Sequence, residues 1–198
     1  MIDRNNNFTT NQVPVDVLWL DINYADVDCE TIECDNYQFF IFNPKNFTTL
    51  GLEQMNGNIS ASGRGIVAIA DPSIKATDDY RVFKDGITIQ STTSPPQNVD
   101  NIFVQDVANN GTYFAECDTG NSSWIDFLNT NAQQFWQDQI SYQNFSGSNS
   151  NYNLWNDLNE PTLYDNETST TLPMDALHYM ASGMDYMHRD LHNVYGAL

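Results

Sequence analysis

Three stretches of the 198-residue chain are rich in apolar residues: positions 13–22, 65–71 and 152–157. Val, Ile, Leu and Trp dominate each run, without a regular polar alternation. Runs of this length and composition are typical of strands that are covered on both faces of a parallel sheet. We therefore expect three parallel strands at these positions.

Two other regions have apolar residues at the spacing of one helix face. The first predicts a helix over residues 128–140, and its face is formed by Leu128, Ala132, Phe135, Trp136 and Ile140. The second predicts a helix that Asp175 caps, with a face formed by Leu177, Met180, Met184, Met187, Leu191 and Val194. Strands alternating with helices indicate an α/β fold.

An aspartate stands at or next to the end of each strand run: Asp21, Asp71 and Asp157. In parallel α/β folds the carboxyl ends of the strands carry the chemistry, so we expect the three carboxylates to converge. The gap from Asp21 to Asp71 fits one helical crossover with a modest insertion. The gap from Asp71 to Asp157 is too long for one, which predicts an insertion over residues 80–123.

A complete (β/α)8 barrel needs about 250 residues and eight strands. With three clear strands, the chain is expected to be a partial (β/α)8 TIM barrel over residues 13–198, preceded by a polar lead-in at 1–12. The alternative is a small, open, doubly wound sheet. The lack of a Gly-rich phosphate loop after the first strand weakens that alternative.

The composition excludes several classes of partner. The net charge is −19, with only seven Lys and Arg, so we expect neither nucleic acid nor an anionic membrane as a partner. No apolar run approaches the ~20 residues of a membrane span. Seven N-x-[ST] sequons point to the secretory pathway, although the first residues do not resemble a secretory signal, so the protein is either cytosolic or begins upstream of Met1.

The three cysteines indicate little about function. Cys29 and Cys34 could close a small disulfide loop in an oxidising compartment. No histidine lies near the cysteines in the sequence, which argues against a zinc site. The acidic segment 26–35 lacks the Gly and Glu of a calcium loop, so no metal is expected there.

The segment 154–161 places Asp157 and Glu160 three residues apart, just beyond a strand and beside Trp155. A glycosidase needs a carboxylate at the anomeric carbon and an aromatic surface for the sugar. On spacing alone, a strand end followed by a turn at Pro161 explains the segment equally well.

A resemblance to a known family decides between these two interpretations. Residues 154–161 resemble the W-x-D-M-N-E-P signature of the glycoside hydrolase family 31 α-glucosidases, with Leu158 in the Met position. Residues 16–22 resemble its D-V-x-W-x-D strand, 69–75 its V-D-P-x-I-K turn and 123–129 its W-P-D-F-x-N stretch. Residues 172–178 and 188–196 are most similar to the glucosidase II branch of the family. The matches follow the family's order and imply roughly the second to fourth barrel strands.

The resemblance implies a role for each matching residue. Asp157 is the catalytic nucleophile, and Asp21 binds sugar hydroxyls at the −1 subsite. Ile69, Trp155 and Leu158 line that subsite.

Asp71 and Glu160 are expected to support the pocket, whereas Asp126 and the three histidines are expected to be structural. The family's acid/base lies on a later strand, beyond Leu198. The implied substrate is an α-glucoside or a glucosylated N-glycan, with no cofactor and no metal. The implied compartment is the endoplasmic reticulum or the secretory pathway, and a glucosidase II-like protein would have a regulatory β-subunit.

One departure from the family favours other functions. The family has Cys-Trp-Pro-Gly before the W-P-D-F stretch, and this chain has Asp118 in place of the Trp, which flanks the substrate. A non-catalytic carbohydrate-binding piece, or a pseudoenzyme of the same fold, is therefore the alternative. The charge alone would favour an acidic interaction domain.

Overall fold

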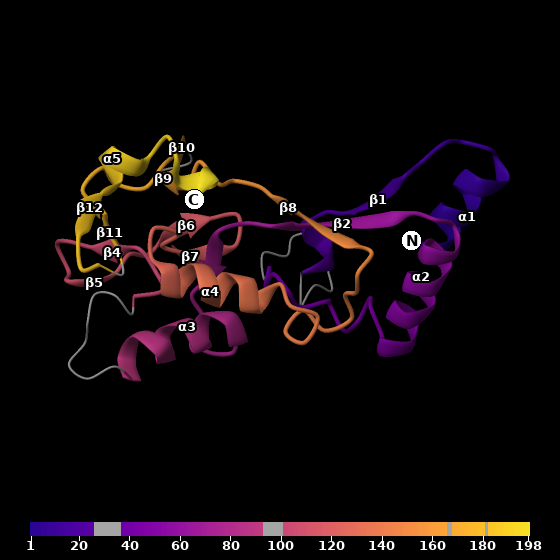
Figure 1. Ribbon diagram of the computed structural model, residues 1–198, viewed down its shortest axis with the longest axis horizontal. Helices are drawn as coiled ribbons and strands as arrows, with labels where there is room; N and C mark the ends of the chain where they lie inside the picture. Colours follow the sequence, from indigo (N-terminus) through magenta and orange to yellow (C-terminus); the bar gives the residue numbers. More distant parts are fainter. Residues whose placement is uncertain (26–36, 93–100, 166–167, 181) are drawn as a thin grey trace. The chain divides into compact units, whose positions relative to one another are not determined.

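The computed structural model describes residues 1–25, 37–92, 101–165, 168–180 and 182–198 (Figure 1). They form two compact units, the first of Met1–Ala70 and Ser141–Asp157 and the second of Asp71–Ile140 and Leu158–Leu198. Cys29, Cys34 and the acidic segment 26–35 lie outside the described residues.

The first unit contains a three-stranded parallel sheet. Its order is β1 (Val17–Leu20), β2 (Gly65–Ala70) and β8 (Tyr152–Asn156), so all three predicted strands and their parallel direction are confirmed. Helix α2 (Thr49–Ala61) lies between β1 and β2 in the sequence, as the spacing predicted, because neighbouring parallel strands need a crossover connection. It begins at Thr48, whose side chain accepts a hydrogen bond from the Gly51 amide.

The strand register separates the two faces of this sheet. Leu18 lies beside Ile66 and Leu20 beside Ala68, and all four are buried. Helix α2 contacts β2 and buries its own apolar residues. The core continues into an aromatic cluster of Tyr24, Phe40, Phe42, Phe145 and Tyr152.

A helix within the expected polar lead-in was missed. Helix α1 (Ile2–Thr10) has no apolar stripe, and polar contacts join it to α2. The buried Asn5 Nδ2 donates to Asn58 Oδ1 (2.9 Å) and Ser62 Oγ (2.9 Å), and Arg64 Nη1 donates to Asn5 Oδ1 (2.6 Å). Apolar periodicity cannot reveal a helix that is attached in this way.

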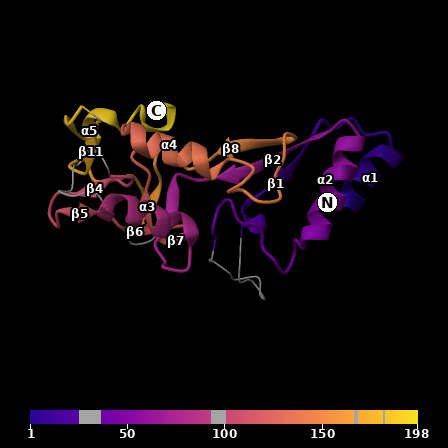
Figure 2. The same ribbon diagram turned by 60° about the horizontal axis from the view of Figure 1, so that its bottom comes forward.

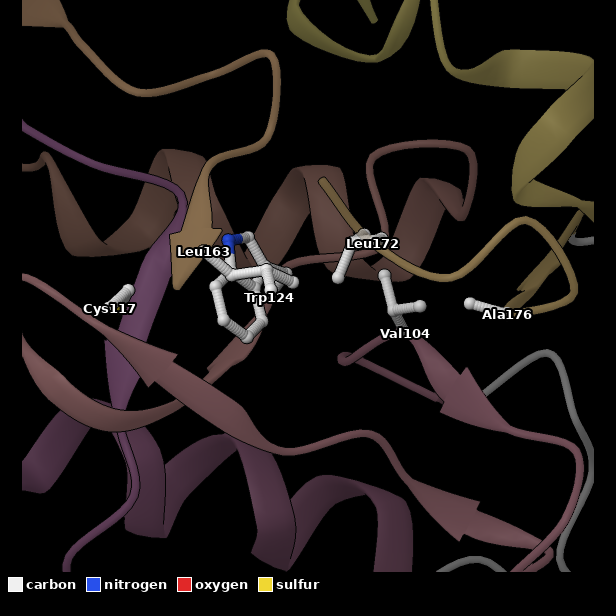
Figure 3. Packing of buried hydrophobic residues seen from close by; sticks show 6 residues of the cluster. All are labelled: Val104, Cys117, Trp124, Leu163, Leu172 and Ala176. Carbon is white, nitrogen blue, oxygen red and sulfur yellow. The ribbon is translucent and has the colours of Figure 1, made fainter. Parts of the chain in front are cut away.

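The second unit is built on two antiparallel sheets (Figure 2). The first has the order β10-β9-β6-β7-β3, formed by Thr168–Thr170, Leu163–Asp165, Ala115–Cys117, Gly120–Trp124 and Ser73–Lys75. The second has the order β12-β11-β4-β5, formed by Asp185–Met187, Leu177–Tyr179, Gln105–Asp106 and Gly111–Thr112. A core cluster of Val104, Cys117, Trp124, Leu163, Leu172 and Ala176 lies in this unit (Figure 3).

Helix α4 (Thr130–Gln139) confirms the first predicted helix. Asn129 caps it by accepting from the Asn131 amide, and Ala132 and Phe135 are buried. Arg81 of α3 (Arg81–Thr92) donates from Nη1 to Gln139 Oε1 at 2.7 Å, which joins α3 to α4. Helix α3 and strands β4 to β6 lie within residues 80–123, and the assignment of that segment as an insertion stays a prediction.

The helix predicted after Asp175 was wrong. Strands β11 (Leu177–Tyr179) and β12 (Asp185–Met187) pair antiparallel, with Leu177 opposite Met187, and in this part of the described chain the helix α5 (His188–Leu191) begins only after them. Gly183 turns the chain with φ +81°, outside the helical region, and the Met180 amide bonds to the Met184 carbonyl. Met180 and Met184 flank the turn and Met187 lies in β12, so their three-to-four spacing marks no helix face, and Asp175 caps no helix.

No helix in the described ranges is long and apolar enough to cross a membrane.

Candidate active site

Each strand of the parallel sheet is followed at once by one of the three aspartates. Asp21 follows β1, Asp71 follows β2 and Asp157 follows β8. The Asp157 amide donates to the Ala70 carbonyl at 3.4 Å, which extends the ladder one residue beyond β8. Asp157 thus stands where a rigid strand passes into a turn.

Four of the seven predicted site residues lie on one face of this sheet. Trp155 is the register partner of Ile69, so their side chains share a face. Asp21 and Asp157 stand two residues beyond Trp19 and Trp155, and alternation places them on the same face. The rings of Trp19 and Trp155 meet edge-on, with centroids 4.9 Å apart. This face therefore has two carboxylates at its carboxyl end, next to exposed indole surface.

Asp21 is fixed by its own backbone. Its side chain accepts from the Ile22 amide at 2.8 Å and caps the 3-10 helix η1 (Ile22–Tyr24). The buried Tyr24 hydroxyl donates to the Ile69 carbonyl at 2.9 Å. These bonds hold the end of β1 against β2.

The other three predicted residues belong to the second unit. Asp71 is buried, with 1% of its surface exposed, whereas Glu160 is exposed and accepts from Thr162 Oγ1 at 3.1 Å. Leu158 has φ +48°, a left-handed conformation that costs a non-glycine residue about 1–2 kcal/mol. Glu160 bonds within its own turn, in keeping with a role other than nucleophile.

No three His, Cys, Asp or Glu side chains gather as metal ligands within the described part of the chain.

Comparison with known proteins identifies the family of the chain. Residues 2–198 match the model of the "Glycosyl hydrolases family 31 TIM-barrel domain". The chain belongs to glycosyl hydrolase family 31.

Two relatives and one solved structure illustrate the similarity. Neutral alpha-glucosidase AB of Sus scrofa is 32% identical over 196 residues, which are 99% of this chain and 18% of that protein. Glucosidase 2 subunit alpha of Schizosaccharomyces pombe is 31% identical over 96% of this chain and 17% of its own length. A Glc1Man2-bound glucosidase II alpha subunit superposes with a TM-score of 0.79 at 28% identity, covering 98% of this chain and 18% of that one.

The chain therefore spans less than a fifth of these relatives. The expected family and the expected partial TIM barrel are both confirmed.

One contact in this family 31 chain was missed from the sequence. Tyr164 Oη donates to Asp118 Oδ1 at 2.6 Å, and Tyr164 is exposed. This bond, with smaller contributions from burial and from nearby charges that include Asp71, raises the pKa of Tyr164 to about 12. The two residues are 46 positions apart and meet because β6 pairs with β9, which no local pattern indicates. Tyr164 thus provides an aromatic ring beside Asp118.

Asp126, His178 and His188 form a buried network in the second unit. His178 Nδ1 lies 2.8 Å from Asp126 Oδ1, and His178 Nε2 lies 3.1 Å from His188 Nδ1. The Tyr179 amide donates to Asp126 Oδ2 at 2.7 Å. Since a carboxylate only accepts, His178 donates from Nδ1, and a neutral His178 then accepts at Nε2 from His188. These contacts fit the structural role expected from the sequence.

Proposed function

We propose that the chain carries the nucleophile of a retaining α-glucosidase, with Asp157 in that role. One observation carries the proposal. Asp157 directly follows a parallel strand, on the same face and at the same end of the sheet as Asp21, Ile69 and Trp155. A short carboxylate at a strand end is held more rigidly than Glu160 in an exposed turn.

In this proposal an Asp157 oxygen bonds to the anomeric carbon while the bond to the leaving oxygen breaks. An acid/base residue on another barrel strand of the full-length protein protonates the leaving oxygen, then deprotonates the water that cleaves the glucosyl ester. Asp21 accepts hydrogen bonds from sugar hydroxyls, and Ile69, Trp155 and Leu158 bound the −1 subsite. Asp71 and Glu160 support the pocket.

The proposed substrate is a glucosylated N-glycan. The support comes from similar proteins, which include a Glc1Man2-bound glucosidase II alpha subunit. Another similar structure is an ER glucosidase II complex with the binding domain of a regulatory subunit. We accordingly place the full-length protein in the endoplasmic reticulum, with a regulatory subunit as its partner.

The decisive test is Asp157→Ala in the full-length protein, with an aryl α-glucoside as substrate. Loss of a covalent nucleophile should lower kcat by about 10³-fold or more. Added azide should partly restore turnover, because it replaces the missing carboxylate. Glu160→Gln is the comparison variant: whatever turnover it loses through the pocket, added azide should not restore it.

A mechanism-based inhibitor provides a second measurement. The labelled peptide should carry the adduct on Asp157. An adduct on Glu160, or normal turnover by Asp157→Ala, would refute the assignment. A full-length protein that binds glucosides without turnover would support the non-catalytic alternative, which is motivated by Asp118 in place of the family's Trp.

A further inference from the structure

A close contact joins Gly196 to the segment that follows Asp157. Gly196 lies in the 3-10 helix η3 (Tyr195–Ala197), and Asn159 Nδ2 donates to its carbonyl at 3.3 Å. A Cβ atom at Gly196 would stand 2.6 Å from the Asn159 carbonyl oxygen and 2.7 Å from its Nδ2. Cβ atoms do not approach other atoms this closely, so any side chain here would displace the Asn159 backbone.

The position of Gly196 is fixed by its neighbour. Tyr195 is fully buried and donates from its hydroxyl to the Ile125 carbonyl at 2.6 Å. Its ring packs edge-on against Phe127, with centroids 5.5 Å apart. Because Tyr195 is anchored in this way, Gly196 presents a fixed surface to Asn159.

The segment held against this surface is strained. Leu158 has φ +48°, and the Thr162 amide closes a turn on the Leu158 carbonyl at 3.0 Å. A left-handed leucine persists only where its surroundings enforce the conformation. Asn159, the next residue, is the residue that contacts Gly196.

We propose that Gly196 is a positioning residue, which sets the path of the chain directly after Asp157 and thereby the aim of its carboxylate. This inference rests on the proposed function. A nucleophile displaced by about 1 Å can lose about 10²-fold in rate. The missing side chain at Gly196 therefore contributes to the reaction without touching substrate.

The test compares two glycine substitutions in the full-length protein. Gly196→Ala should lower kcat by about 10- to 100-fold with little change in KM. Gly111→Ala is the matched control from the same unit, because its new methyl group would have its nearest neighbour at 3.9 Å. It should leave both constants unchanged.

Azide separates positioning from general damage. Azide attacks without the help of a side chain, so Gly196→Ala should cause no further loss in the azide-rescued Asp157→Ala enzyme. An equal loss in both backgrounds, or no loss in the unmodified enzyme, overturns the inference.

Hydrogen exchange tests the contact without relying on activity. The Thr162 amide should exchange faster in Gly196→Ala than in Gly111→Ala, because the turn it closes has been displaced. If the full-length protein has no α-glucosidase activity, the proposed function fails, and this exchange rate still decides the contact. An unchanged rate refutes it.

Discussion

At the scale of single residues, the buried pair of His178 and His188 has a consequence for stability in acid. Burial, followed by the neighbouring His178 and His192, lowers the pKa of His188 to about 4. The groups around it are Asp126, reached through His178, and the buried Tyr195. Because His188 Nδ1 already donates to His178, an added proton goes to His188 Nε2, whose hydrogen-bond partner is the Thr171 hydroxyl at 3.5 Å.

This network predicts a loss of local stability in acid. Because folding lowers the pKa of His188, the fold keeps its full stability while the pH is above the pKa of the unfolded histidine, near 6.5. That stability is lost as the pH falls towards 4. The amide protection of Tyr179, which bonds to Asp126, should fall by about ten-fold over this range, beyond the ordinary effect of pH on exchange. His188→Gln should make this fall in amide protection smaller. If the variant keeps the full dependence on pH, a group other than His188 is responsible.

A second residue-scale prediction concerns Tyr164. Tyr164→Phe removes the hydrogen bond to Asp118 and keeps the ring. If the ring of Tyr164 binds the sugar, Tyr164→Phe should change KM by less than about two-fold, whereas Tyr164→Ala should raise KM by about 5- to 20-fold. Equal KM values for the two variants would exclude the ring from substrate binding.

At the scale of elements, the sequence predicted what depends on local pattern. The three strands were found because continuous apolar runs favour parallel strands, although β1 leaves Val17 and Trp19 exposed instead of covered on both faces. Helix α4 was found because its apolar residues recur at the spacing of one helix face. Helix α1 was missed because polar contacts hold it. The β11–β12 hairpin was misread because Gly183 and cross-strand pairing override helical spacing.

The candidate site, like the elements, could be predicted only in part from the sequence. Asp21, Asp71 and Asp157 were predicted from the strand ends, and Trp155 from the resemblance to the family. The contacts of Tyr164 and Gly196 depend on residues far apart in the chain, which no periodicity reveals.

Alanine substitutions at two glycines with equal space around them should have opposite effects on stability. A Cβ would meet nothing within 4 Å at Gly57 in α2 or at Gly183 in the hairpin turn. Gly57→Ala should stabilise its helix by about 0.5–1 kcal/mol, because alanine has the higher helix propensity. Gly183→Ala should destabilise its hairpin by about 1 kcal/mol, because φ is +81° there. Hydrogen exchange in α2 and in the β11–β12 hairpin measures the two changes in stability. Changes of the same sign would contradict the prediction.

At the scale of the whole molecule, the isolated 198 residues should be poorly soluble or molten. The parallel sheet has open edges at β1 and β8, and its Trp155 face leaves Trp19 60% and Val17 45% exposed. We expect dye binding and aggregation in spite of the charge of −19. A monomer with a sharp, reversible, two-state thermal transition would show that the remaining barrel strands are not needed.

The sequons of the full-length protein should differ in use if it enters the secretory pathway. Asn46 and Asn110 are exposed outside regular strands and helices, and should carry glycan. Asn58 should not, because its side chain is bonded to Asn5 and Asn6 across α1 and α2. Asn121, within β7, should not either. Peptide mass spectrometry after enzymatic deglycosylation measures this, and an unchanged gel mobility would count against the proposed compartment.

The edge-on contact between Trp19 and Trp155 gives the proposed site an optical signal that comes from its own side chains. Two indoles with centroids 4.9 Å apart and planes at 66° are close enough for their electronic transitions to couple. Trp19 is on β1, and Trp155 stands two positions before the proposed nucleophile on β8. A sugar bound against Trp155 would change the circular dichroism of the pair and its fluorescence, so occupancy could be followed without a labelled substrate. Trp19→Phe would abolish the coupled signal and leave that of the buried Trp124 in place.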